Sequence, residues 1–152
     1  MILSKQAIIA HIKNSAIGIE PFTEQNLKQA SYTLTLGRVI RIAAEKKLRP
    51  DIAGRSYKDI TMDEQGHVLE PGAFVPGSSR EKITLPENIC AMLSNRGTCA
   101  RMGIDVTQSS FFIEPESDNV MVFEIKNNNV IPVTVFPEMQ IAKCIFMHVV
   151  NK

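Results

Sequence analysis

Short runs of alternating apolar and polar residues, separated by turn residues, constrain the fold of this chain more than any other feature of its sequence. In "QASYTLTLG" (29–37), Tyr32, Leu34 and Leu36 alternate with serine and threonine, which predicts a half-buried strand because successive side chains of a strand point to opposite faces. Similar runs follow beyond residue 66, and the turns between them contain Pro71-Gly72, Pro86–Asn88 and Asn127–Asn129. Many short strands predict an all-β fold, a distorted β-barrel or jelly roll.

One segment has helical periodicity. In "KQAIIAHIKN" (5–14), Ala7, Ile8 and Ile12 have helical spacing, Ser4 precedes them as a possible N-cap, and Gly18 lies just beyond. These signals predict one N-terminal α-helix. Between residues 45 and 66 the sequence is charged and poor in apolar residues, which predicts a long surface excursion. The length of 152 residues predicts a single domain, 1–152.

Charge and cysteine content exclude several classes of function. The chain has 17 Lys and Arg against 16 Asp and Glu, a net charge of +1, which argues against nucleic-acid binding but leaves small phosphorylated ligands open. Three separated cysteines (Cys90, Cys99, Cys144) and three histidines lack zinc-site spacing, so we expect neither a disulfide framework nor a zinc site. The N-terminus resembles neither a signal peptide nor a membrane span, so we expect a cytoplasmic protein without a membrane partner.

The segment "RGTCAR" (96–101) places two arginines five positions apart. Backbone N–H groups, the Thr98 hydroxyl and Arg96 can together cradle a phosphate, and Gly97 allows a ligand to approach closely. The alternative is a tight turn at a subunit contact, with the arginines bonded to carbonyl groups. Cys99 has no histidine near it in the sequence, which favours a small core residue over a nucleophile.

Strand parity singles out Glu124. In "NVMVFEIKN", Met121, Phe123 and Ile125 face one side, whereas Val120, Val122 and Glu124 face the other. Glu124 therefore lies on an apolar face, where desolvation would raise the pKa of a carboxyl group toward that of a general base, unless a cation such as Arg101 pairs with it. Parity alone favours a structural buried ion pair over a catalytic carboxylate.

Five motifs in order resemble the dCTP deaminase family, and through it the trimeric dUTPase superfamily. "ASYTLTLG" is similar to the family's "SYDLRLG", "LEPGAFV" to "L.PG.F", and "ITLPENICAMLSNRGTCARMGIDV" to "LP.....LDGRSSLARLGL.V". "IEPE" is similar to "IDPG", and "VMVFEIKNNNVIPVTVFPEMQIAKCIF" to "LEFYN....P..L.PGM.IGQL.F". The likeness runs from about residue 2 to residue 147.

The resemblance implies a homotrimer with deoxycytidine nucleotide sites shared between subunits. It implies zinc-independent deamination of dCTP to dUTP and ammonia, with Glu124 activating water and Arg101 supporting it, at the family's ungapped spacing. Ser110 matches a family alanine whose backbone helps to place the water. Arg96 matches the first arginine of the motif. The substrate-binding residues implied are Arg96, Gly97, Thr98, Ser110 and Ile113, and Mg²⁺ would be bound through the substrate phosphates.

The sequence also departs from the family. Thr33 replaces the aspartate of "SYDL", Gly97 replaces the first serine of "RSS", and Glu116 replaces the glycine of "IDPG". Phe111-Phe112 replace a histidine-arginine pair, and the sequence stops at Lys152, where relatives continue into an arm that closes over the triphosphate. Two alternatives therefore stay open: a dUTP pyrophosphatase, and a non-catalytic relative that binds a nucleotide or a protein partner.

Overall fold

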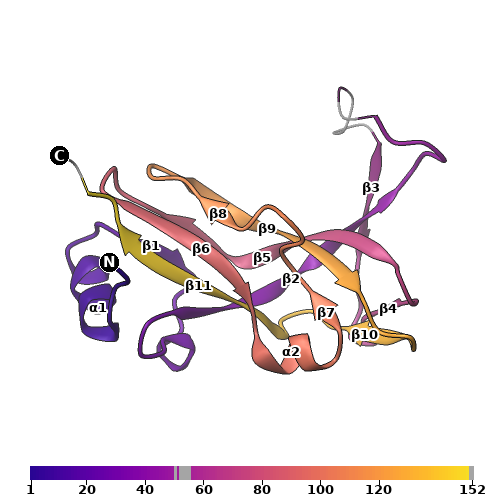
Figure 1. Ribbon diagram of the computed structural model, residues 1–152, viewed down its shortest axis with the longest axis horizontal. Coiled ribbons are helices and arrows are strands. Elements are labelled where there is room, and N and C mark those ends of the chain that lie inside the picture. Colours follow the sequence, from indigo (N-terminus) through magenta and orange to yellow (C-terminus); the bar gives the residue numbers. More distant parts are fainter. Residues whose placement is uncertain (50, 52–55, 151–152) are drawn as a thin grey trace.

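The computed structural model, which describes residues 1–49, 51 and 56–150, is built around a nine-stranded antiparallel sheet (Figure 1). Seven strands form a continuous order, β7–β9–β5–β2–β11–β6–β8, while β1 pairs with β5 and β3 with β2. Their bounds are β1 Gly18–Glu20, β2 Tyr32–Ala43, β3 Tyr57–Thr61, β5 Phe74–Thr84, β6 Ile89–Asn95, β7 Ile104–Asp105, β8 Phe112–Ile113, β9 Asp118–Asn127 and β11 Gln140–His148. The order ends on two strands of only two residues each.

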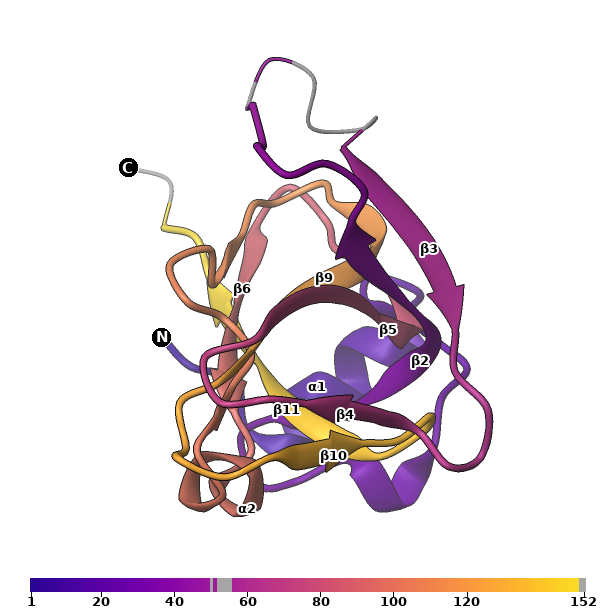
Figure 2. The same cartoon turned by 90° about the vertical axis from the view of Figure 1, so that its right-hand side faces the viewer.

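This sheet curls around the core, as Figure 2 shows, and a second sheet of β4 (His67–Leu69) and β10 (Val133–Val135) lies beside it. The largest fully buried side chains include Tyr32 on β2, Phe123 on β9 and Phe146 on β11. The all-β prediction of a distorted barrel or jelly roll is thus confirmed. No helix in the part of the chain that the structure describes is long and apolar enough to span a membrane.

The predicted N-terminal helix is present as α1 (Lys5–Lys13). The hydroxyl of Ser4 caps it by accepting a hydrogen bond of 3.3 Å from the backbone N–H of Ala7. Ile8 is fully buried and anchors the helix, while Ala7 and Ile12 pack at the margin of the core. The Ser4 cap sets where α1 begins, and the apolar spacing determines which side of the helix packs on the core.

Strand β2 differs from its prediction in length and in burial. It continues to Ala43, and both faces are buried from Tyr32 to Leu36, so that Thr33 and Thr35 lie in the interior rather than in solvent. Thr35 is accommodated because its N–H and hydroxyl both donate to the buried carboxylate of Glu81, at 2.9 and 2.8 Å. A buried threonine that has hydrogen-bond partners therefore gives the same alternating sequence pattern as an exposed threonine on a half-buried strand.

The predicted surface excursion between residues 45 and 66 is partly wrong. Tyr57–Thr61 forms β3, whose residues pair with Val39–Ala43 of β2. The charged residues Lys58 and Asp59 are exposed on this strand, because an edge strand can carry polar side chains and still satisfy its backbone by pairing. Residues 50 and 52–55 of the predicted excursion lie outside the described residues.

Two short helices were not predicted. The 3₁₀ helix η1 spans Glu24–Asn26, and α2 spans Gly97–Arg101, where the sequence indicated a tight turn or loop. Gly103 follows α2 with φ of +80°, a conformation that favours glycine, and its carbonyl accepts a hydrogen bond of 2.8 Å from the N–H of Asn128. Gly103 thereby fixes the direction in which the chain leaves α2 and enters β7.

We expect Gly103→Ala to lower the free energy of unfolding by roughly 2–3 kcal/mol, since the new Cβ would combine left-handed backbone strain with a clash. That Cβ would lie 2.9 Å from both the Cβ and the backbone N of Asn129. Gly72→Ala is the matched control, because Gly72 has φ of +77° but no atom within 4 Å of the added Cβ. Urea unfolding of both variants separates strain from clash, and an equal loss in the two would show that contact with Asn129 is unimportant.

Candidate functional site

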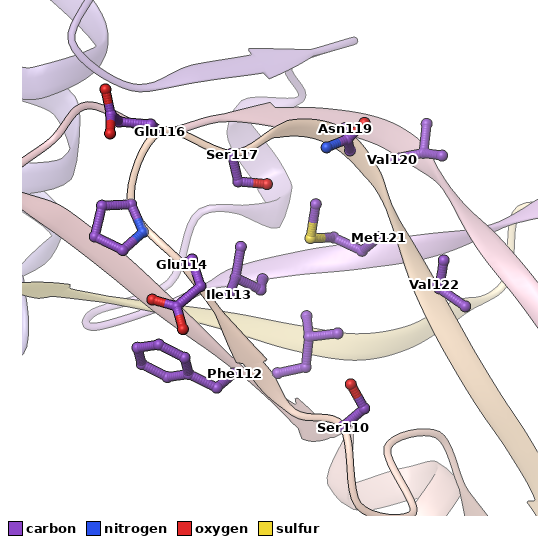
Figure 3. A pocket seen from close by; sticks show the side chains of 12 residues that line it. Ser110, Phe112, Ile113, Glu114, Glu116, Ser117, Asn119, Val120, Met121 and Val122 are labelled. Carbon is purple, nitrogen blue, oxygen red and sulfur yellow. The ribbon is translucent and has the colours of Figure 1, made fainter.

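A pocket of about 310 Å³ lies between β8, the turn after it and β9 (Figure 3). Its walls come from Leu93, Ser110, Phe112–Ser117 and Asn119–Val122. Two predicted substrate-binding residues, Ser110 and Ile113, line it. The charged side chains that line it are the carboxylates Glu114 and Glu116, so the pocket favours neutral or cationic groups of a ligand over its phosphates.

Glu124 adjoins this pocket through Ser110. Its Oε2 accepts hydrogen bonds from the backbone N–H groups of Ser109 and Ser110, at 3.1 and 3.4 Å. The loop that supplies these donors is tied to β9, because the N–H of Glu124 donates to the carbonyl of Val106 at 2.8 Å. The carboxylate is thus held beside Ser110, next to the pocket but not among its lining residues.

The parity prediction for β9 is confirmed: Met121, Phe123 and Ile125 are buried, and Val120 and Val122 lie on the opposite face. That face is open in this chain, with Val122 57% exposed and Glu124 only half-buried. A single chain therefore leaves the Glu124 carboxylate in contact with solvent, in contrast to the expected desolvation. Desolvation of this carboxylate requires a second surface that covers this face.

Two residues that the sequence motifs do not single out, Asn95 and Asp105, shape the loop at Glu124. The Asp105 carboxylate accepts hydrogen bonds from the Asn95 side chain and the Thr107 N–H, both 3.2 Å, and the Asn95 amide oxygen accepts one of 2.9 Å from the Val106 N–H. Asp105 with Thr107 two residues on is a typical Asx-turn pattern, which could have identified this turn. No local signal points to Asn95, because its partners come from a different element.

The remaining predicted residues lie on and before α2. Arg96 is half-buried at the N-cap position, Thr98 is exposed, and Arg101 is exposed in the last turn. A Cβ added to Gly97 would lie 3.5 Å from Arg101 Nη1, so the guanidinium folds back over the first turn of its own helix. Arg101 and Glu124 form no ion pair within the described chain.

Cys99 lies on α2 and is a core residue, as expected. It is 1% exposed, and its thiol donates a hydrogen bond of 3.6 Å to the carbonyl of Gln140. Burial raises the pKa of the Cys99 thiol, and nearby Arg96 offsets part of that rise. Burial also raises the pKa of the Cys144 thiol. The thiolate forms of both side chains are therefore disfavoured in the folded protein.

We accordingly expect Cys99 and Cys144 to react with an aromatic disulfide reagent at pH 8 at least about tenfold more slowly in the folded protein than in urea. The released thiolate can be followed by absorbance, with Cys99→Ser and Cys144→Ser used to assign the slow phases. Fast modification of Cys99 in the folded state would contradict the buried position.

In the described residues, no three His, Cys, Asp or Glu side chains gather into a group that could hold a metal ion. This absence concerns metal ions that side chains alone would hold. A cation bound through substrate phosphates needs no such group of side chains, because the phosphate oxygens are its ligands.

A family model described as dCTP deaminase-like matches residues 2–149. The chain is 31% identical over 152 residues to the "dCTP deaminase, dUMP-forming" of Coprothermobacter proteolyticus, covering 96% of this chain and 81% of that protein. It is 30% identical over 162 residues to the protein of the same name from Nanoarchaeum equitans, covering 94% and 82%.

Solved structures show the same fold. The 2'-deoxycytidine 5'-triphosphate deaminase from Agrobacterium tumefaciens superposes with a TM-score of 0.76 at 21% identity, covering 95% of this chain and 46% of that chain. The dUTPase of Staphylococcus bacteriophage 80alpha superposes with a TM-score of 0.58 at 9% identity, covering 90% and 84%. At such low identities the likeness concerns the fold alone.

Proposed function

The chain belongs to the dCTP deaminase-like family, and from this membership we propose that it catalyses the hydrolytic deamination of dCTP. The observation that carries the proposal is the position of Glu124. Its carboxylate is hydrogen-bonded to two backbone N–H groups beside a pocket, and the volume of this pocket is suited to the base and sugar of a nucleotide.

In the proposed reaction, Glu124 accepts a proton from a water molecule as the water oxygen attacks C4 of cytosine. Glu124 delivers this proton to the ring nitrogen N3, where it stays. The carboxylate then takes the second proton from the new C4 hydroxyl and delivers it to the exocyclic amine, so that the C4–N bond breaks, ammonia leaves and C4 becomes a carbonyl carbon. The hydrogen bonds from Ser109 and Ser110 orient the carboxylate and keep Oε2 as an acceptor. The backbone of Ser110 helps to place the water, as the family resemblance implies. This scheme uses a carboxylate in place of zinc.

The phosphates would lie toward α2 rather than in the pocket, since two carboxylates line the pocket. Arg96, the backbone of Gly97 and Thr98 would contact them, and Mg²⁺ would be bound through the phosphate oxygens. Arg101 would support Glu124 by offsetting negative charge. The exposed guanidinium of Arg101 can reorient toward a ligand because nothing in the described chain pairs it with a carboxylate.

We propose that the protein assembles as a homotrimer whose subunit contacts complete the site. The face that holds Glu124 also exposes Val120 and Val122, and the exposed Phe112 lines the same pocket as these two valines. An exposed apolar face beside a functional carboxylate fits a protein–protein contact. Covering it would exclude water from around the Glu124 carboxylate. Sedimentation velocity gives the assembly state directly, and a monomer at micromolar concentration would contradict this assignment.

A second candidate product is dUMP, because the relatives named above are called dUMP-forming. Forming dUMP from dCTP requires loss of ammonia and also cleavage of the phosphate chain, whereas simple deamination yields dUTP. The two outcomes share the attack at C4 and differ in the fate of the phosphates.

Incubation of the protein with dCTP and Mg²⁺, followed by ammonia release and nucleotide chromatography, tests the proposal. Ammonia with dUTP supports simple deamination, and ammonia with dUMP supports the second candidate. Release of dUMP from added dUTP, without ammonia from dCTP, would instead indicate a pyrophosphatase. If dCTP raises the melting temperature but neither product forms, the protein is a nucleotide-binding relative and the enzymatic proposal is wrong.

A further inference from the structure

Two histidines from opposite ends of the sequence meet in the fold, away from the pocket just described. His11 lies in the last turn of α1 and His148 at the end of β11, and their ring centroids are 5.4 Å apart with an interplanar angle of 64°. Both side chains are half-buried, so each imidazole is partly shielded and still reaches solvent.

The spacing of the rings suits a shared metal ion. A metal about 2.0–2.1 Å from one nitrogen of each ring, with a tetrahedral angle between them, holds the ring centroids roughly 5 Å apart. The observed separation of 5.4 Å is close to this value. Neutral imidazole is the commonest side-chain ligand for borderline transition metals.

The surroundings narrow the class of metal. No third His, Cys, Asp or Glu joins the pair among the described residues, so the site lacks the carboxylates through which proteins usually bind Mg²⁺ and Ca²⁺. The chain start lies close by, because the N–H of His148 donates to the carbonyl of Met1 at 3.1 Å and Ile2 bridges to Met147. Water molecules would fill the remaining coordination positions on the solvent side.

We propose that His11 and His148 form a two-imidazole site for a divalent transition metal ion such as Ni²⁺, Zn²⁺ or Cu²⁺. A bound ion links α1 to β11, and therefore joins the start of the chain to its last described strand (Figure 1). Because the metal binds the folded arrangement of the two rings, its binding stabilises the docking of α1. The site is independent of the proposed deamination.

Calorimetric titration of tag-free protein with Ni²⁺ at pH 7.5 tests the site, since a polyhistidine tag would hide it. We expect one ion per chain, and a rise in melting temperature of about 3–6 °C when free Ni²⁺ is ten times the dissociation constant. His11→Asn and His148→Asn should each weaken binding at least about tenfold. His67→Asn is the matched control, because His67 is also half-buried but lies on β4 in the second sheet.

Absence of Ni²⁺ binding in the wild-type protein, or equal weakening by all three substitutions, would overturn the proposal and leave an ordinary ring contact. Circular dichroism of each metal-free variant checks that it is folded. Should a variant fail to fold, the imidazole resonances of the wild-type protein decide the question: paramagnetic Ni²⁺ must broaden those of His11 and His148 and leave those of His67 unchanged. Broadening of all three alike would contradict the site.

Discussion

Replacing Glu124 by glutamine is expected to lower kcat for dCTP deamination by about 10²- to 10⁴-fold, because the substitution removes the group proposed to accept the proton of the attacking water. The fold should persist. The amide oxygen of glutamine can still accept the hydrogen bonds that Ser109 and Ser110 donate to Oε2, and the side chain keeps its length. The measurement is ammonia release from saturating dCTP, together with the KM for dCTP.

Glu87→Gln provides the control for Glu124→Gln. Glu87 is an exposed carboxylate in the turn between β5 and β6, outside the pocket lining, and its substitution should leave kcat unchanged. An active Glu124→Gln enzyme would rule out the proposed role of this carboxylate. A rise in KM with unchanged kcat would instead assign Glu124 to substrate binding.

Replacing Phe123 by alanine is expected to destabilise the protein by about 3–5 kcal/mol, the usual cost of removing a large aromatic side chain from a core. Phe123 is fully buried on β9 and pairs in register with Gly77 of β5. Because Gly77 has no side chain, it cannot fill the resulting cavity. Urea unfolding followed by circular dichroism measures the loss.

Phe136→Ala is the control for Phe123→Ala, because it removes the same side chain from an exposed position and so shows how much of the stability loss depends on burial. Phe136 follows β10 and is 43% exposed, so its truncation should cost only about 1 kcal/mol. Comparable losses in the two phenylalanine variants would show that Phe123 does not owe its effect to core packing.

Local sequence signals predicted the elements whose causes are local. The Ser4 cap and apolar spacing predicted α1, and parity predicted which side chains of β9 are buried. The same reasoning failed for β2, because burial on both faces depends on what other elements cover it. Thr35 lies inside the protein only because Glu81, distant in the sequence, offers its carboxylate to it.

The candidate site shows the same division. The family motifs and parity pointed to Glu124 from the sequence, but its carboxylate is held by Ser109 and Ser110, in a loop fixed by Asn95. That arrangement is tertiary, so a single sequence gives little sign of it. The role of Arg101 stays a prediction, because its partner would be a ligand, a second subunit or a reoriented Glu124.

The way the sheet ends has a consequence for behaviour at high protein concentration. The continuous strand order stops at β7 and β8, each of two residues, and the longer β3, which pairs only with β2, exposes Lys58 and Asp59. Open strand edges are templates on which other chains can add strands and aggregate, whereas short edges and charged edge residues oppose such growth. Among the strands described, this chain therefore offers little backbone for fibril-like addition, and we expect concentrated samples to associate through side-chain surfaces rather than by sheet extension.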